Sequence, residues 1–227
     1  MLLENFTLID LSHPLSPTIP TWDNSCGFQL KVGIDNDEII INTSAGTHID
    51  APSHFLEEQL TIDALPLQQL LVAACVIDVS SRATASYAIS LQDIERYEAD
   101  YGPILENSLI IGYTGWSRYW PDAKAYRNAN ANGEMQFPVF SIQAIEYLLQ
   151  RKIAGIGIDC FSPEPIRLSN PSYPIHQMLF KEKKYIIENI ANGNLLPPRG
   201  AYILALPLKT QNGGEAPARV IALVPKK

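Results

Sequence analysis

The chain has 227 residues, of which 46% are hydrophobic and 18% are charged, a composition typical of a globular protein with a large core. Its net charge of −7 argues against a nucleic-acid partner, because binding to phosphates needs a basic surface. No apolar run approaches the roughly 20 residues that span a bilayer, and the N-terminus lacks the basic region of a signal peptide. The three cysteines are widely spaced and indicate no disulfide framework, so we expect a cytoplasmic protein that does not enter a membrane.

Hydrophobic patterning predicts many strands and a few helices. Strands are expected at 8–11, 28–34, 38–43, 73–79, 108–112, 154–158, 185–188, 201–206 and 219–224. Helices are expected at 62–71, 90–101, 141–150 and 175–181, with serine caps at the start of the second and third. The first strands should be antiparallel, while strands and helices alternate in the middle of the chain. This order predicts a mixed-sheet α/β fold in a single domain over residues 1–227.

Potential metal ligands are concentrated between Ser44 and His54. The chain has four histidines; His48 and His54 lie in this stretch, with Asp50 between them. A third, His176, is followed twelve residues later by Glu188. Imidazole and carboxylate groups gathered in this way are typical of a metal centre with a nearby proton-transfer group.

The spacing also suggests how these groups are arranged. If residues 44–50 are extended, Ser44, His48 and Asp50 point to one face of a strand. The proline at position 52 would end the strand and let His54 turn back over that face as a general acid or base. A single histidine in a strand is more often structural. Two histidines and an aspartate within seven residues of a histidine-poor chain favour a metal site.

This stretch closely resembles the HxGTHxDxPxH motif of the metal-dependent cyclase family, which includes bacterial kynurenine formamidase and isatin hydrolase. The first histidine of the motif is replaced by Ser44. Further segments similar to the family are Asp10-Leu-Ser-His13-Pro, Pro20-Thr-Trp22-Asp, Thr114-Gly-Trp116, Gly157-Ile-Asp159, Ile-Ile-Glu188-Asn and Gly213-Gly-Glu-Ala-Pro217-Ala-Arg219. The resemblance therefore covers most of the chain.

The resemblance implies a swivelling β/β/α-type fold that carries one or two divalent ions, zinc or manganese. It implies that His48, Asp50, His176 and Glu188 are the ligands. By the same resemblance His54 is the catalytic acid/base, Trp22 contacts the substrate, and the protein is a homodimer or larger. The implied reaction is hydrolysis of a small amide, an N-formyl anilide or a cyclic amide. A divalent ion lowers the pKa of its bound water towards about 7, which suits this reaction.

The serine at position 44 leaves three outcomes open, because a hydroxyl is a poorer zinc ligand than imidazole. A single ion remains and the enzyme still hydrolyses amides; a water held by Ser44 completes a weaker two-metal site; or the site has decayed. We favour one ion over two. The alternative function is a catalytically silent small-molecule binding protein with a degraded metal site, and a weaker one is a structural subunit.

Four further residues have alternative interpretations. We expect His13 to be structural and Cys160 to be a buried thiol rather than a ligand. Asp159 either orients a ligand histidine or forms a turn. Trp116 either packs in the core or lines the substrate pocket.

Overall fold

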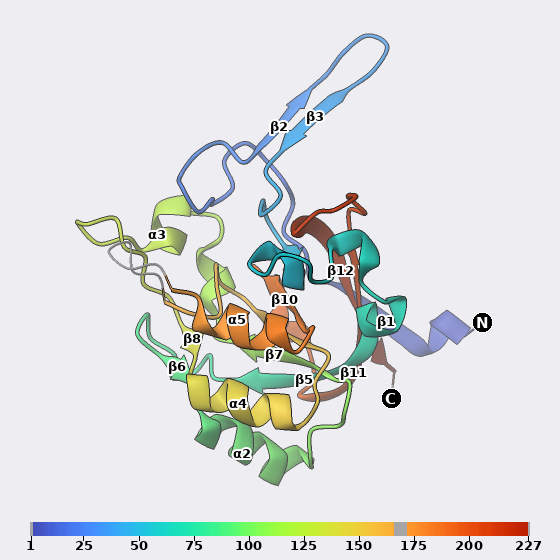
Figure 1. Cartoon of the computed structure of the whole chain (residues 1–227), viewed down its shortest axis with the longest axis vertical. Helices are drawn as coiled ribbons and strands as arrows, with labels where there is room; N and C mark the ends of the chain where they lie inside the picture. The colour runs from blue at the N-terminus through green and yellow to red at the C-terminus, as the bar shows by residue number, and fades with distance from the viewer. Residues whose placement is uncertain (1, 166–171, 227) are drawn as a thin grey trace.

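The computed structural model describes residues 2–165 and 172–226, and within them eight strands form one sheet. The strand order is β1-β12-β11-β5-β7-β9-β10-β4, and β4 also pairs with β12. This second pairing closes the strands from β12 to β4 into a barrel, which β1 flanks along β12 (Figure 1). The predicted mixed-sheet α/β fold is therefore confirmed, with a sheet that closes on itself.

The sheet contains both parallel and antiparallel pairs. Its strands are β1 (Phe6–Asp10), β4 (His48–Asp50), β5 (Leu71–Asp78), β7 (Leu109–Tyr113), β9 (Gly155–Ile158), β10 (Tyr185–Glu188), β11 (Arg199–Pro207) and β12 (Glu215–Pro225). The strands β5, β7, β9 and β10 run parallel to one another, whereas β1, β4, β11 and β12 pair antiparallel with their neighbours. Outside the barrel, β2 (Phe28–Lys31) and β3 (Glu38–Ile41) form the predicted antiparallel hairpin, and β6 (Ala88–Ile89) pairs with β8 (Val139–Phe140).

Helices connect the parallel strands and cover them on one side. These are α2 (Leu91–Tyr101), α4 (Ile142–Gln150) and α5 (Pro174–Lys181), seen beside the barrel in Figure 1. The predicted serine caps of the first two are present: Ser90 forms a capping box with Asp93, and Ser141 accepts a hydrogen bond from the third amide of its helix. Shorter helical segments are η1 (Leu2–Asn5), η2 (Pro52–His54), η3 (Ile62–Ala64), α1 (Leu67–Leu70), η4 (Trp116–Tyr119), α3 (Ala123–Arg127) and η5 (Gly193–Leu195).

The predicted helix over 62–71 is wrong as a single element. It is divided into η3 and α1, and Leu71 already belongs to β5. Pro66 causes the break, because a proline disfavours helical backbone in the residue before it. Leu65 accordingly has an extended ψ of 127°.

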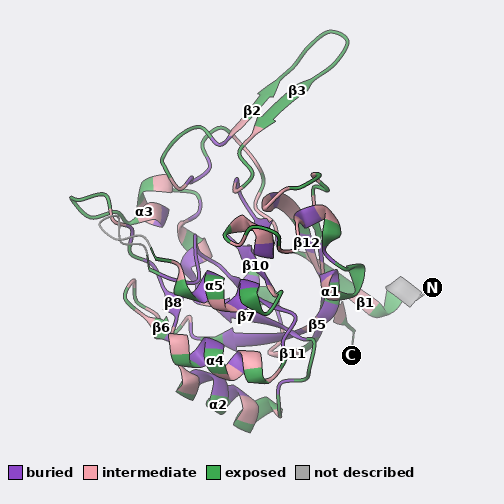
Figure 2. Cartoon of the chain, in the orientation of Figure 1, coloured by how far each residue is buried: buried purple, intermediate pink, exposed green. Residues whose placement is uncertain are grey.

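The alternation of side chains along the strands separates two cores. On β5, Val72, Ala74 and Val76 belong to the cluster inside the barrel, whereas Cys75 and Ile77 belong to the cluster under the helices. Figure 2 shows these layers as buried and the β2–β3 hairpin as largely exposed. Side chains on the outer face of the barrel strands can therefore pack against helices or form a binding site.

The carboxylate of Glu98 links α2 to α4 by hydrogen bonds. Glu98 accepts two hydrogen bonds of 3.0 Å from Arg151 and one from the hydroxyl of Tyr147. The Arg151 guanidinium, with Tyr147, holds the pKa of Glu98 at about 2, against an ordinary value of 4.5. Because the native pKa is depressed, the resulting stabilisation is complete above about pH 4.5 and is lost as the pH falls towards 2.

We expect Glu98→Gln to lower the free energy of unfolding by about 1 kcal/mol at pH 7, since the charge-assisted bonds are lost but Arg151 stays partly hydrated. Urea unfolding from pH 7 to pH 2 measures the effect, and the difference from wild type should shrink below about pH 4.5. Glu95→Gln, an exposed position on the same helix, is the control. A difference that stays constant with pH would contradict this assignment.

Candidate metal centre

The short strand β4 places two candidate ligands on the outside of the barrel. Ile49 belongs to the cluster inside the barrel, so its neighbours His48 and Asp50 point outward. Strand β4 lies between β10 and β12, and its register sets His48 opposite Glu188 of β10 and Asp50 opposite Glu215 of β12. Three neighbouring strands therefore bring carboxylates and an imidazole to one patch of the outer face.

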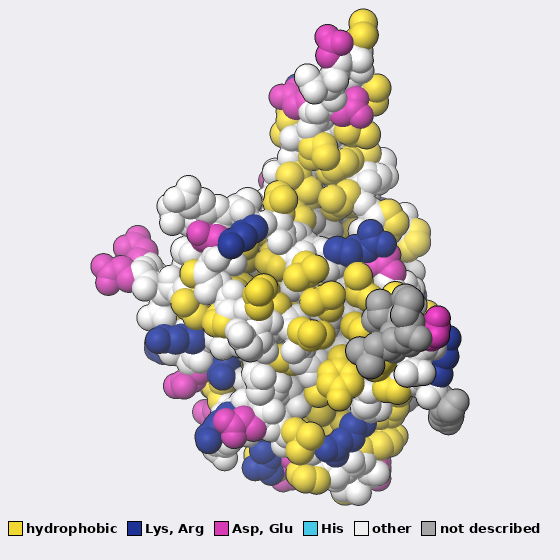
Figure 3. All heavy atoms as spheres, turned by 90° about the vertical axis from the view of Figure 1, so that its right-hand side faces the viewer, with side chains coloured by type: hydrophobic (Ala, Val, Ile, Leu, Met, Phe, Trp, Pro, Cys, Tyr) yellow, Lys and Arg dark blue, Asp and Glu magenta, His cyan; other side chains and the backbone are white. Residues whose placement is uncertain are grey.

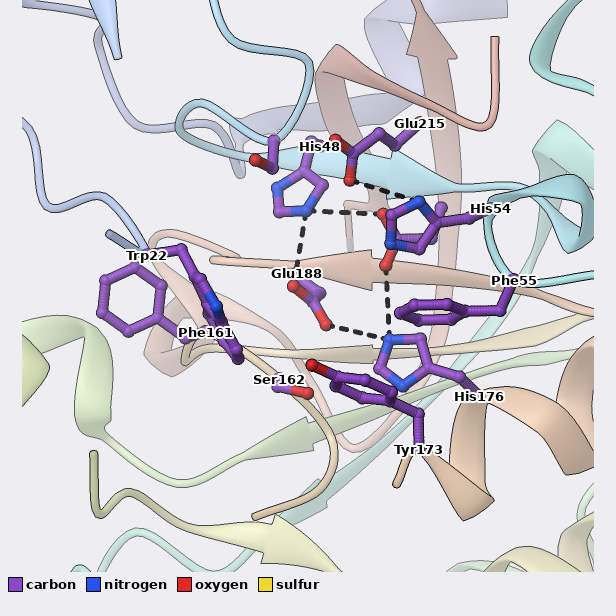
Figure 4. A pocket seen from close by; sticks show the side chains of 12 residues that line it. Trp22, His48, His54, Phe55, Phe161, Ser162, Tyr173, His176, Glu188 and Glu215 are labelled. Carbon is purple, nitrogen blue, oxygen red and sulfur yellow. Dashed lines mark ion pairs between the residues drawn. The ribbon is translucent and has the colours of Figure 1, made fainter. Parts of the chain in front are cut away.

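Two further histidines reach this patch from helical segments. His176 lies on α5, and His54 ends η2 directly after β4. Figure 4 shows both side chains beside those of β4 and β10 around a common space. The structure thus brings together all five residues that the sequence nominated as ligands or acid/base.

In the four predicted ligands, both histidines face both carboxylates. His48 Nε2 is 3.4 Å from Asp50 Oδ1 and 3.3 Å from Glu188 Oε2. His176 Nε2 is 3.5 Å from Asp50 Oδ2 and 3.4 Å from Glu188 Oε1. Each carboxylate therefore turns one oxygen to each histidine, and all four residues are buried.

The tautomers of both histidines follow from what their other ring nitrogen contacts. His48 Nδ1 lies 3.0 Å from the carbonyl oxygen of Gly46, which only accepts, so Nδ1 carries the proton. His176 Nδ1 contacts the buried carboxylate of Glu164, which also accepts backbone hydrogen bonds from Ile175 and His176. The Nε2 atoms are therefore the ring nitrogens turned towards the carboxylates. In the neutral imidazole each would offer a lone pair to an ion, the arrangement that metal-binding histidines use.

The pKa values of the buried histidines and of Asp50 are shifted in the direction that favours positive charge in the cluster. Burial disfavours the imidazolium of His48, but Asp50 and Glu188 outweigh it and raise its pKa to about 10. Burial likewise opposes the charge of His176, and its contacts with Asp50, Glu164 and Glu188 raise its pKa well above the usual value. Burial would raise the pKa of Asp50, yet His48 and His176 bring it below the usual value. A divalent cation would supply the same compensation.

The residues present fit such an ion. Asp50 Oδ1 is buried and has no hydrogen-bond partner among the described residues. Two three-residue groups have ligand atoms within 4.8 Å of one another: Asp50, His176 and Glu188, and Asp50, His48 and Glu215. Imidazole nitrogen and carboxylate oxygen are ligands that suit zinc and manganese.

The extended chain over 44–50, on which the expected common face of Ser44, His48 and Asp50 depended, is present only in its last part. Ser44 lies in a turn, and only His48–Asp50 is a strand. Gly46 causes the turn with a φ of +69°, a conformation that residues with a Cβ rarely adopt. Ser44 nevertheless lines the same pocket as His48 and Asp50.

The pocket over the cluster has a volume of about 280 Å³ and aromatic walls. Trp22, Phe55, Phe161 and Tyr173 line it together with the polar cluster. His54 is partly exposed at its edge, with Nδ1 3.6 Å from Glu215. A flat apolar ligand would therefore meet the cluster and His54 at the same time (Figure 4).

The remaining residues with alternative interpretations lie outside the pocket. Trp116 packs in the core and donates to the carbonyl of Tyr126. His13 stacks on Trp120 at 4.0 Å between ring centroids. Cys160 is buried and donates to backbone carbonyls, as expected of a structural thiol.

Asp159 does not orient a ligand histidine among the described residues. It accepts hydrogen bonds from the amide and hydroxyl of Thr114 and from the amide of Ser117, so it holds the turn after β7. The carboxylate that orients His176 is Glu164, which the sequence analysis did not nominate. Neither Glu164 nor Glu215 has a spacing signal in the chain, although Glu215 follows the Gly213-Gly pair.

Comparisons with known proteins identify the family of the chain. The family model described as "Putative cyclase" matches residues 9–165. Isatin hydrolase of Roseibium aggregatum is 32% identical over 197 residues, covering 83% of this chain and 74% of the relative. Kynurenine formamidase of Bacillus thuringiensis is 26% identical over 222 residues, covering 94% and 95%.

Solved structures are similar over nearly the whole chain. Isatin hydrolase A from Labrenzia aggregata, bound to benzyl benzoate, has a TM-score of 0.90 at 26% identity and covers 100% of this chain and 96% of its own. A potential metal-dependent hydrolase with cyclase activity has a TM-score of 0.77 at 25% identity, covering 98% and 100%. The proteins that share this fold therefore include an isatin hydrolase and a potential metal-dependent hydrolase. The chain belongs to the cyclase family.

Glu164→Gln should lower the affinity for zinc or manganese by about 10- to 100-fold, because His176 loses the carboxylate that fixes its Nδ1–H. Metal affinity is measured by competition with a chromophoric chelator, and thermal unfolding of the metal-free variant checks the fold. Glu57→Gln, an exposed position near η2, is the control. An unchanged affinity in a folded Glu164→Gln protein would show that Glu164 has no part in metal binding.

Proposed function

We propose that this protein is a metal-dependent hydrolase that cleaves a carbon–nitrogen bond, other than a peptide bond, in a small aromatic or cyclic amide. The observation that carries the proposal is the buried set of two imidazoles and two carboxylates, whose ligand atoms face one another under an aromatic pocket. The relatives named isatin hydrolase and kynurenine formamidase support this class of substrate, and kynurenine formamidase-like chemistry is one form of it.

We assign His48, Asp50, His176 and Glu188 as metal ligands. One zinc or manganese ion, favoured over two from the sequence, suffices for the reaction. Bound there, it would activate water and polarise the amide carbonyl. The side chains of the chain then have separate tasks: Glu164 holds His176 in place, and Asp50 and Glu188 compensate positive charge.

We assign His54 as the general acid/base. Hydrolysis forms a bond from a water oxygen to the amide carbon and breaks the carbon–nitrogen bond, so one proton must pass from the water to the leaving nitrogen. His54 lies at the rim of the cluster, partly exposed and 3.6 Å from Glu215, where it can accept and return this proton. Trp22, which meets Phe161 edge-on in the pocket wall, is assigned to substrate binding.

His54→Ala should lower kcat/KM by about 10²- to 10⁴-fold and leave the metal content unchanged, because proton transfer is lost but the ligands remain. Isatin and N-formylkynurenine are the substrates to assay, with metal content measured by mass spectrometry on the same preparations. Glu57→Ala is the control variant.

Two outcomes would contradict this proposal. Less than about 0.1 equivalent of zinc, manganese or iron after metal loading would exclude the hydrolase and favour the small-molecule binding protein. Joint loss of metal and activity in His54→Ala would show His54 to be a ligand instead.

We further propose a cytoplasmic homo-oligomer, a dimer or larger. No helix among residues 2–165 and 172–226 is long and apolar enough to cross a membrane. The cysteines Cys26, Cys75 and Cys160 are unpaired, which fits a reducing compartment.

The exposed β2–β3 hairpin supports assembly with a second copy of the chain. Val32 and Ile34 near its tip are 80% and 104% exposed, and Leu30 and Ile39 face each other across it, each at least half exposed. Figure 3 shows hydrophobic side chains continuing from the hairpin across the face of the molecule below it. Exposed apolar surface of this extent is typical of a contact between proteins.

The double change Val32→Glu and Ile34→Glu should convert the oligomer to a monomer of about 25.2 kDa, because charges would be buried in the contact. Light scattering coupled to size-exclusion chromatography measures the mass. Leu105→Glu, an exposed apolar position away from the hairpin, is the matched control. A wild-type monomer, or a variant that remains oligomeric, would contradict the hairpin assignment.

A further inference from the structure

Glu215 stands in the candidate metal centre without a role in the function proposed above. It is the first residue of β12, and the strand register sets it opposite Asp50. Its side chain is 19% exposed and lines the pocket together with Ser44, His48 and His54. We propose that Glu215 is a metal ligand that forms, with His48 and Asp50, a second cation position beside the one of Asp50, His176 and Glu188. This inference rests on the metal dependence proposed above, and it replaces the single ion favoured there with two.

The geometry of the shared carboxylate supports two neighbouring positions. Asp50 turns Oδ1 towards His48 and Oδ2 towards His176, so its two oxygens serve the two groups separately. The ligand atoms of His48, Asp50 and Glu215 lie within 4.8 Å of one another, as do those of Asp50, His176 and Glu188. A bridging carboxylate between two ions is a common feature of two-metal hydrolytic sites.

The buried oxygen on the His48 side has an ion pair with His48 Nε2 at 3.4 Å but no hydrogen bond among the described residues. Asp50 Oδ1 has no hydrogen bond among the described residues, although Asp50 is 2% exposed. A buried carboxylate oxygen without a donor is costly, and a cation between it, His48 and Glu215 would remove this cost. This observation is independent of Glu215 and points to a ligand at the same place.

Glu215 is held in a way that leaves one oxygen for an ion. Thr43 donates a 2.6 Å hydrogen bond to Oε1 of Glu215. The other oxygen, Oε2, lies 3.6 Å from His54 Nδ1, beyond a normal hydrogen bond. Thr43, in the turn before β4, therefore holds one oxygen of the carboxylate. The carboxylate is turned towards His54 in the pocket (Figure 4).

Glu215 also accounts for the serine at position 44. Ser44 and Glu215 line two pockets in common, the one over the cluster and the one beside it. A serine hydroxyl is a weak, neutral ligand, whereas a carboxylate brings both an oxygen and a negative charge. The third donor for the group of His48 and Asp50 then comes from β12, and residue 44 has no need to bind.

A competing role for Glu215 is to orient His54, since the two side chains form an ion pair at 3.6 Å. The two roles differ in a property that does not depend on turnover. A ligand determines how much metal the protein holds, whereas a residue that positions His54 changes activity and its pH profile only.

The test measures metal stoichiometry after loading with zinc or manganese and dialysis, on wild type, Glu215→Ala, Glu215→Gln and the double variant Ser44→His/Glu215→Ala. Wild type should hold about two equivalents, and both single variants about one, because neither alanine nor a neutral amide replaces the carboxylate. The double variant should recover about two, since an imidazole then enters the pocket from position 44. Glu95→Ala on the exposed face of α2 is the control, and circular dichroism checks folding.

The outcomes separate this proposal from the proposed function. If wild type and Glu215→Ala hold the same amount of metal with equal affinity, Glu215 is not a ligand. If only the pH profile of kcat then changes, Glu215 positions His54 and the proposal is overturned. A wild type without metal would instead overturn the hydrolase function itself, and complete loss of metal from Glu215→Ala would overturn the arrangement in two positions.

Discussion

The site depends on the pairing of β4, a strand of three residues, with β10 on one side and β12 on the other. This double pairing closes the barrel and fixes the register of the three strands at once. Because side chains alternate, Ile49 is pulled into the barrel and its two neighbours are forced outward. Glu188 and Glu215 reach the same patch only in this register, since a slip of one residue would reverse every side chain.

Local signals in the sequence predicted much of the fold. Serine caps and apolar periodicity located α2 and α4, and the continuous apolar runs located the buried strands β5, β7 and β9. The closure of the sheet was not predictable in this way, because it depends on contacts between β4 and a strand more than 160 residues later in the chain. The turn at Ser44–Gly46 was missed because a glycine in an apparently extended segment can either continue the strand or turn the chain.

Three of the nominated site residues share a property that the missed Glu164 and Glu215 lack. His48, Asp50 and His54 are close in sequence and chemically unusual together, so a pattern can identify them. Glu164 and Glu215 are single carboxylates with no local pattern, and they reach the cluster only through the position of α5 and the register of β12. Residues that reach a site from distant parts of the sequence can therefore be identified only once the fold is known.

The charges of the cluster connect stability with function. Asp50, Glu164 and Glu188 are buried beside two histidines, and the raised imidazole pKa values show that the protein without a cation must draw protons into its interior to balance them. A divalent ion held by these residues would replace those protons and leave both imidazoles neutral. The negative charges that require protons in this cluster are therefore the same ones that would attract a metal ion. The aromatic walls above it would suit a flat, uncharged substrate that reaches the cluster.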